Sequence, residues 1–245
     1  MSEWPADAAS VLLQGAQLSV DGVPAGSIDE VVKRQRLTRL DDLFVALRAR
    51  RSAWENAHPG AKFGGVAVFW LDASTKLVVV KSIFQTAAFA GYPYLAFAVR
   101  PKSDPNALAR INATAIVPGP PGFASTRTEE PLALHVNAVE GKDLTLTRQT
   151  GDKVISKVSV GERVDLGASA FPILAAKVSR EWAAHGKHRS RDDSRFDSAI
   201  LHTSDSLTLQ TMIALTDSIY VPLRDFVFRH KLERVPAFDV SLAVR

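Results

Sequence analysis

The sequence predicts an α/β fold of the α+β type, with two small units that each contain a mixed sheet covered by two helices. Three observations predict it. Short apolar runs typical of strands are interspersed with longer segments whose apolar residues recur at helical spacing. The same order of segments occurs twice, on either side of a proline-rich stretch. The chain has 245 residues, which is enough for two small domains.

The composition is that of a globular protein, with 46% hydrophobic and 23% charged residues. Because there is no cysteine, disulfides, thiolate catalysis and zinc–thiolate sites are excluded. The net charge is only +4, and it is evenly distributed: 11 basic against 9 acidic residues in 1–100, and 19 against 17 in 101–245. Nucleic-acid-binding proteins usually concentrate their basic charge, so we expect no nucleic-acid partner.

The first unit opens with two strand signals, at residues 10–15 and 17–22, and the Asp21-Gly22 dipeptide that ends the second predicts a tight turn. Apolar residues then recur at helical spacing from Leu40 to Trp54, which predicts a helix. The wholly apolar run GVAVFWL at residues 65–71 predicts a buried strand.

The next segment carries no charge between Lys81 and Arg100, and its length just reaches that of a membrane span. Polar residues inside it and the pair Gly91 and Pro93 argue against a span. We expect about three turns of helix, a turn at Gly91, and a strand from Tyr94 to Val99. The helix should have a polar face, made of Lys81, Ser82 and Gln85.

The second unit repeats this order and is longer. Its segments are three strand signals, a helix, a strand, a helix and a last strand, at residues 132–139, 143–149, 153–160, 171–186, 198–203, 209–219 and 238–245. The landmark AFAVR at 96–100 matches SLAVR at 241–245, and the extra length falls in the segments 186–195 and 221–234. The paired landmarks predict an internal duplication.

Six of the thirteen prolines lie in residues 101–131, which predicts a linker with one short ordered piece near residues 109–117. The expected organisation is therefore a first unit at 1–100, a Pro-rich linker at 101–131 and a second, diverged unit at 132–245.

The first unit resembles the periplasmic domain of the ExbD/TolR biopolymer-transport proteins over about residues 11–100, and the second unit resembles it more faintly over 132–245. In that family a strand ends in an Asp, a helix runs to an Ala-Gly pair, and a final strand follows. Here Leu71-Asp72, Val79–Phe89 and Ala90-Gly91 occupy those places. Family members also carry an N-terminal transmembrane helix whose Asp couples proton flow to work, and nothing in this chain corresponds to it.

The resemblance implies a non-enzymatic module that binds partners or transmits force in a proton-driven energy-transduction complex. It implies envelope protein partners such as a proton-channel subunit, with no catalytic residue, cofactor or metal. Because the family's periplasmic domains resemble obligate pairs, a duplicated chain is expected to be a monomer with an intramolecular pseudo-dimer. The resemblance implies a periplasmic or inner-membrane-associated location. Because the N-terminus lacks a secretion signal, a cytoplasmic location is kept as the alternative.

The strongest electrostatic feature is the basic region 33–51, in which Arg34, Arg36, Arg48 and Arg51 are the candidate partner-binding residues. It supports the main rival interpretation, a cytoplasmic nucleic-acid-binding or adaptor protein. An enzyme of the α/β-hydrolase type is a third and weaker alternative. The sequence upstream of the gene would distinguish the first two.

Three residues are expected to have structural roles. Asp72 and Asp205 each precede a helix, where an Asp can cap backbone N–H groups, and Gly91 makes a turn. His185 and His188 are three residues apart, and His202 and Asp205 follow downstream, so these residues are a candidate zinc site. His185, however, is followed by glycine and is typical of a helix C-terminus, so no metal is expected.

Overall fold

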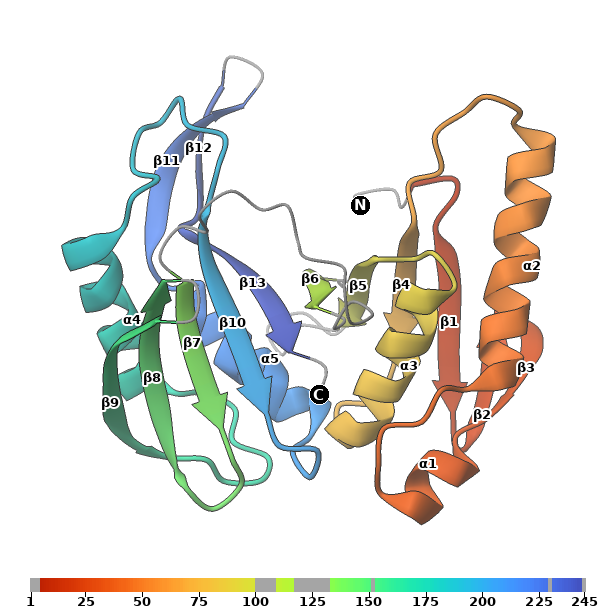
Figure 1. The fold of residues 1–245 in the computed structure, drawn as a ribbon, viewed down its shortest axis with the longest axis horizontal. Helices are drawn as coiled ribbons and strands as arrows, with labels where there is room; N and C mark the ends of the chain where they lie inside the picture. The colour runs from red at the N-terminus through yellow and green to blue at the C-terminus, as the bar shows by residue number, and fades with distance from the viewer. Residues whose placement is uncertain (1–4, 100–108, 117–132, 151–152, 229–230, 244–245) are drawn as a thin grey trace. The chain divides into compact units, whose positions relative to one another are not determined.

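The computed structural model describes residues 5–99, 109–116, 133–150, 153–228 and 231–243. By their internal contacts these residues form two compact units that divide between residues 117 and 118. Each unit contains a mixed sheet with helices packed on it (Figure 1). This confirms the predicted fold class.

The first unit begins with an antiparallel meander and continues with alternating helices and strands. Its elements are β1 (Ala9–Gln14), β2 (Gln17–Val20), β3 (Val23–Ser27), α1 (Asp29–Arg34), α2 (Asp41–Ala57), β4 (Val66–Trp70), α3 (Leu77–Phe89), β5 (Tyr94–Val99) and β6 (Ala109–Ile116). The strand order is β3-β2-β1-β4-β5-β6. Within it β4 runs parallel to both β1 and β5, and β6 pairs antiparallel with β5.

The second unit follows the same plan. Its elements are β7 (Ala133–Ala138), β8 (Asp143–Thr150), β9 (Lys153–Arg163), α4 (Pro172–His185), β10 (Asp197–Thr203), α5 (Leu209–Ile219), β11 (Leu223–Phe228), β12 (Lys231–Pro236) and β13 (Phe238–Ala243). The sheet order is β9-β8-β7-β10-β13, with β10 parallel to β7 and to β13. The strands β11 and β12 form a separate antiparallel hairpin.

Both units therefore share one topology. A three-stranded meander is followed by a helix and by a fourth strand that runs parallel to the first; a second helix and a last strand, parallel to the fourth, complete it. The short helix α1 is an addition to the two helices expected for the first unit. The hairpin β11–β12 is an addition to the second unit. Most of the expected linker lies outside the described residues, and its described part, β6, extends the first sheet.

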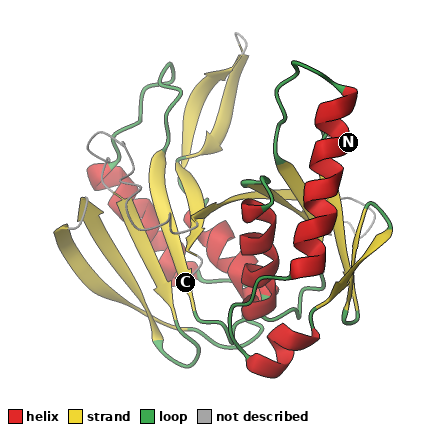
Figure 2. Cartoon of the chain, turned by 45° about the vertical axis from the view of Figure 1, so that its right-hand side comes forward, coloured by secondary structure: helices red, strands yellow, loops and turns green. Residues whose placement is uncertain are grey.

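The helices of each unit pack on the sheet and on one another. The longest described helix, α2, contacts β2, β3 and α3, while α4 contacts β9 and α5. Figure 2 shows the helices in red beside the strands in yellow. In the first unit the rings of Phe69, Phe84 and Phe97 pack together, with centroids 5.0–6.1 Å apart. Burying side chains of this size is the main source of stability in a small domain.

The helix α3 lacks the solvent-facing polar side that the sequence suggests, because Lys81 and Ser82 are both buried. The hydroxyl of Ser82 instead accepts a hydrogen bond from the backbone N–H of Thr38 at 3.1 Å. A polar side chain of α3 therefore provides a hydrogen-bond acceptor for the extended segment that precedes α2.

Among the described residues, none of the helices is both long enough and apolar enough to cross a lipid bilayer.

Candidate functional site

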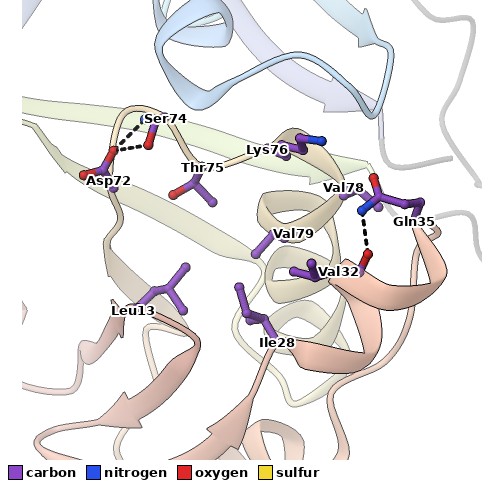
Figure 3. Close-up of a pocket in the computed structure, with 11 residues that line it drawn as sticks. Leu13, Ile28, Val32, Gln35, Asp72, Ser74, Thr75, Lys76, Val78 and Val79 are labelled. Carbon is purple, nitrogen blue, oxygen red and sulfur yellow. Dashed lines mark hydrogen bonds between the residues drawn. The ribbon is translucent and has the colours of Figure 1, made fainter.

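A cavity of about 390 Å³ lies in the first unit, where β1 and β4 end (Figure 3). Its apolar side is made by Leu13 after the middle of β1, Ile28 and Val32 around α1, and Val79 in α3. Crevices at the carboxyl ends of adjacent parallel strands are the usual ligand-binding places of α/β sheets, because the chain leaves each strand there in a different direction.

The rim of the cavity is polar. Gln35, Thr75 and Lys76 line it together with Asp72. The side chain of Gln35 donates to the backbone carbonyl of Val32 at 2.5 Å, which closes the end of α1. The rim thus carries one exposed cation and one exposed anion above an apolar floor. A cavity of this size and lining suits an apolar side chain or a small ligand with a polar end.

Asp72 shapes the turn that leads from β4 to α3. Its carboxylate accepts hydrogen bonds from the backbone N–H of Ser74 at 2.7 Å and from the Ser74 hydroxyl at 2.6 Å. These two bonds hold the pKa of Asp72 below its ordinary value, and the bond from the hydroxyl has the larger effect. The N-cap position of α3 is Lys76, and no side chain caps it. Asp72 therefore orders the turn before the helix rather than its first residues.

The equivalent turn in the second unit contains Asp205, between β10 and α5. The N-cap of α5 is Thr208, whose hydroxyl accepts from the backbone N–H of Thr211 at 3.3 Å. Gly91 follows α3 with φ = 97°, a backbone conformation that side chains with a Cβ rarely adopt.

The four candidate arginines lie on three segments. Arg34 ends α1 and pairs with Glu30 at 2.7 Å, and Arg36 is exposed in the following loop. On α2, Arg48 lies 6.0 Å from the ring centroid of Phe44. Arg51, on the same helix, pairs with Glu55 at 2.8 Å. Two of the four are thus partly neutralised by neighbouring carboxylates.

Arg50, which is not one of the four candidates, makes three hydrogen bonds to residues far away in the sequence. Its guanidinium donates to the carbonyls of Asp7 and Ala8, at 2.6 and 2.5 Å, and to the carboxylate of Asp21. Arg50 therefore ties the start of β1 and the β2–β3 turn to α2. No local sequence pattern predicts these partners, because they lie 29 or more residues away from Arg50.

The histidines occupy different environments. His185 is the last residue of α4, and the following Gly186 donates its N–H to the carbonyl of Trp182 at 2.8 Å. His188 is buried, with Nδ1 2.9 Å from a carboxylate oxygen of Asp193. Among the described residues, no group of three or more imidazole and carboxylate side chains is arranged to hold a metal ion.

A pair that the sequence did not suggest lies on neighbouring strands β7 and β10. Nδ1 of His135 is 2.9 Å from Nε2 of His202. The ring planes differ by only 14° and the centroids are 5.1 Å apart, so the rings meet edge to edge and not face to face. One ring nitrogen therefore donates its proton to the lone pair of the other.

No protein-family model matches the chain, and no curated protein sequence matches it significantly.

Proposed function

We propose that this protein is a non-enzymatic module that binds partners and transmits force, like the periplasmic part of the ExbD/TolR biopolymer-transport complexes. One observation carries the proposal: the same meander–helix–strand–helix–strand topology occurs in both units. In the first unit it also contains the Asp-led turn and the Ala-Gly pair on which the resemblance rests. Such a module would work in the periplasm or at the inner membrane.

The central strands of each sheet suit a mechanical role. In the first unit β1, β4 and β5 are adjacent and parallel, with β1 and β5 on either side of β4. A force along these strands loads all their interstrand hydrogen bonds at once, in shear. A sheet resists such a force better than one that breaks its hydrogen bonds one after another. Because both units share the arrangement, the chain provides two such sheets in tandem.

The cavity beside α1 is the contact that we assign to a partner protein. Its floor of Leu13, Ile28, Val32 and Val79 would take an apolar side chain, and the charges of Asp72 and Lys76 at the rim would orient the partner's backbone or polar groups. The partner class that fits the proposal is the proton-channel subunit of the same complex.

Co-purification with the proton-channel subunits encoded in the same genome tests this proposal. The variant Val32→Trp places a large ring at the cavity, where Val32 is 48% exposed. The matched control is Val45→Trp, at a position on α2 that is 63% exposed and does not line the cavity. We expect wild type and control to retain the subunit and Val32→Trp to lose it by about tenfold or more.

Failure of the wild-type chain to retain any of these subunits would contradict the proposed function. Equal retention by both tryptophan variants would contradict only the role of the cavity. In addition, a chain that contains two units able to pair with each other should sediment as a monomer of 26.6 kDa.

A further inference from the structure

The two segments that lengthen the second unit meet in one structure, which we call the basic lobe. It consists of the loop at residues 186–196 and the hairpin strands at 221–228 and 231–236. The backbone N–H of Val227 in β11 donates to the carbonyl of Arg191 in the loop at 2.8 Å. The ring of Phe196 lies 6.1 Å from that of Phe226. Beyond these contacts the hairpin extends as a separate ribbon (Figure 1).

Arg224 in β11 fastens the hairpin to the loop. Its side chain is buried, and its guanidinium donates to the backbone carbonyls of His188 at 2.7 Å, Ser190 at 3.3 Å and Asp193 at 2.8 Å. The cation also lies 4.6 Å from the ring centroid of Phe196. The base of the lobe is therefore held in a defined conformation.

The outer end of the hairpin exposes apolar side chains on both faces. The outermost described pairs are Phe228 opposite Lys231 and Val227 opposite Leu232. Because neighbouring strand residues point to opposite faces, Phe228 and Leu232 lie on different faces of the ribbon. They are 48% and 62% exposed. A groove in a protein would cover one face, whereas a lipid interface surrounds an inserted tip and contacts both.

The lobe also carries a net positive charge. Its described residues include seven basic and four acidic ones, a net charge of +3, compared with +4 for all 245 residues. Six basic side chains among its described residues are exposed: Lys187, Arg189, Arg191, Arg195, Lys231 and Arg234. The surface that complements this lobe is therefore anionic.

We propose that the basic lobe docks on an anionic lipid surface. Phe228 and Leu232 insert at the level of the headgroups, and Lys231 and Arg234 contact lipid phosphates. Two apolar side chains and a few cations bind a bilayer weakly and reversibly, and the cationic contribution is screened by salt.

A single label tests the insertion. The chain has no cysteine, so Leu232→Cys creates one site for an environment-sensitive fluorophore. With vesicles of phosphatidylcholine and phosphatidylglycerol at low ionic strength, we expect a blue shift that disappears at high ionic strength. Phosphatidylcholine vesicles alone should give none. A label at Val45→Cys, equally exposed on α2 of the first unit, should not respond.

Co-sedimentation of the unlabelled full chain with the same vesicles measures affinity. Replacing Lys231 and Arg234 together by Gln should weaken binding about 30-fold, since each cation near an anionic surface contributes on the order of 1 kcal/mol. The control replaces the exposed Lys33 and Lys62 by Gln and should change affinity by less than about twofold.

Replacing Phe228 and Leu232 by Ser should weaken binding about tenfold or more, with circular dichroism confirming that the variant is folded. The proposal is wrong if wild type does not bind anionic vesicles at low ionic strength, binds neutral ones equally, or loses as much affinity in the control. It is also wrong if polyglutamate, and not the vesicles, binds the chain in a manner that depends on Lys231 and Arg234. That result would assign the lobe to an acidic protein.

Discussion

The backbone N–H of Leu40 donates to the hydroxyl of Thr86 at 3.0 Å, in a buried position that joins residues 46 apart in the sequence. One turn earlier in α3, the Ser82 hydroxyl accepts from Thr38. Each hydroxyl also donates to the backbone carbonyl four residues earlier in the helix: Thr86 to Ser82 at 2.7 Å, and Ser82 to Val78 at 2.8 Å. The segment before α2 thus has its hydrogen bonds satisfied by side chains of α3.

Thr86→Val should destabilise the first unit by about 1–3 kcal/mol, because it leaves the buried N–H of Leu40 without an acceptor. Thr86→Ser keeps the hydroxyl and is the control, with an expected cost below about 1 kcal/mol for the lost methyl group. Urea denaturation measures both. Equal midpoints for the two variants would contradict the role of this bond.

Gly91→Ala should destabilise the protein by about 1–3 kcal/mol, because φ = 97° is strained for any residue with a Cβ. The added Cβ would also lie 2.0 Å from a guanidinium nitrogen of Arg51, which is flexible and can move away. Gly60→Ala is the control for strain alone, since φ is 82° there and the space is open. We expect similar thermal shifts for both, and no rescue of Gly91→Ala by Arg51→Ala. A large rescue would show that crowding dominates.

Arg224→Met should loosen the basic lobe, because three backbone carbonyls lose a charged donor. We expect a loss of at least about 2 kcal/mol and faster tryptic cleavage within residues 186–196. Arg224→Lys should fail in the same way, because an ammonium cannot reproduce the planar fork of the guanidinium. An unchanged cleavage pattern in Arg224→Met would mean that the loop is held by other contacts.

Asp193 should make the lobe sensitive to acid. Hydrogen bonds from Arg195, and then from His188, hold the pKa of Asp193 well below its usual range. A carboxyl whose folded pKa is depressed adds stability above its unfolded pKa of about 3.9 and loses it as pH falls toward the folded value. Asp193→Asn should therefore be less stable than wild type at neutral pH, with a difference that shrinks below about pH 4.

Thermal melts as a function of pH measure this difference. The control is Asp192→Asn, whose exposed carboxylate lies 3.9 Å from Arg191, and it should match wild type throughout. A constant gap between Asp193→Asn and wild type at every pH would contradict the assignment.

The two units should unfold cooperatively when expressed separately, and the first unit should need β6. β6 pairs with β5 along six residues, from Tyr94 opposite Thr114 to Val99 opposite Ala109. A piece covering residues 1–117 should therefore be more stable and less prone to aggregate than one covering 1–100, which exposes β5 as a sheet edge. Denaturant unfolding and light scattering compare them. Equal behaviour of the two pieces would show that β6 contributes nothing.

Local patterns in the sequence predicted much of the fold. The Asp21-Gly22 pair predicted a tight turn, and both residues have positive φ, 49° and 83°. In β13 the residues Phe238, Val240 and Leu242 are buried and Asp239 is exposed, as their alternation predicted. These features follow from contacts between residues a few positions apart, so their period is visible in the sequence.

The candidate site was less predictable. The basic region predicted Arg48 and Arg51 as partner-binding residues. Arg50, on the same helix, is the one that makes long-range hydrogen bonds, to residues just before β1 and to the β2–β3 turn. The loop and the hairpin that form the basic lobe appeared only as extra length in the second unit. Arg224 was not distinguished from the other arginines, because its partners are backbone carbonyls that carry no sequence signal.

The sequence by itself determined the fold class, its repetition and the order of the main strands and helices, but not β3, α1, β11 and β12. The predicted features depend on the periodicity of apolar residues along short segments. Only the tertiary structure decided which polar residues are buried and what they bind. Ser82 and Thr86 satisfy a distant backbone segment, and Arg224 joins two insertions into one lobe. These pairings are made between residues about 30 or more positions apart, and they form because a buried polar group must find a partner wherever the fold places one.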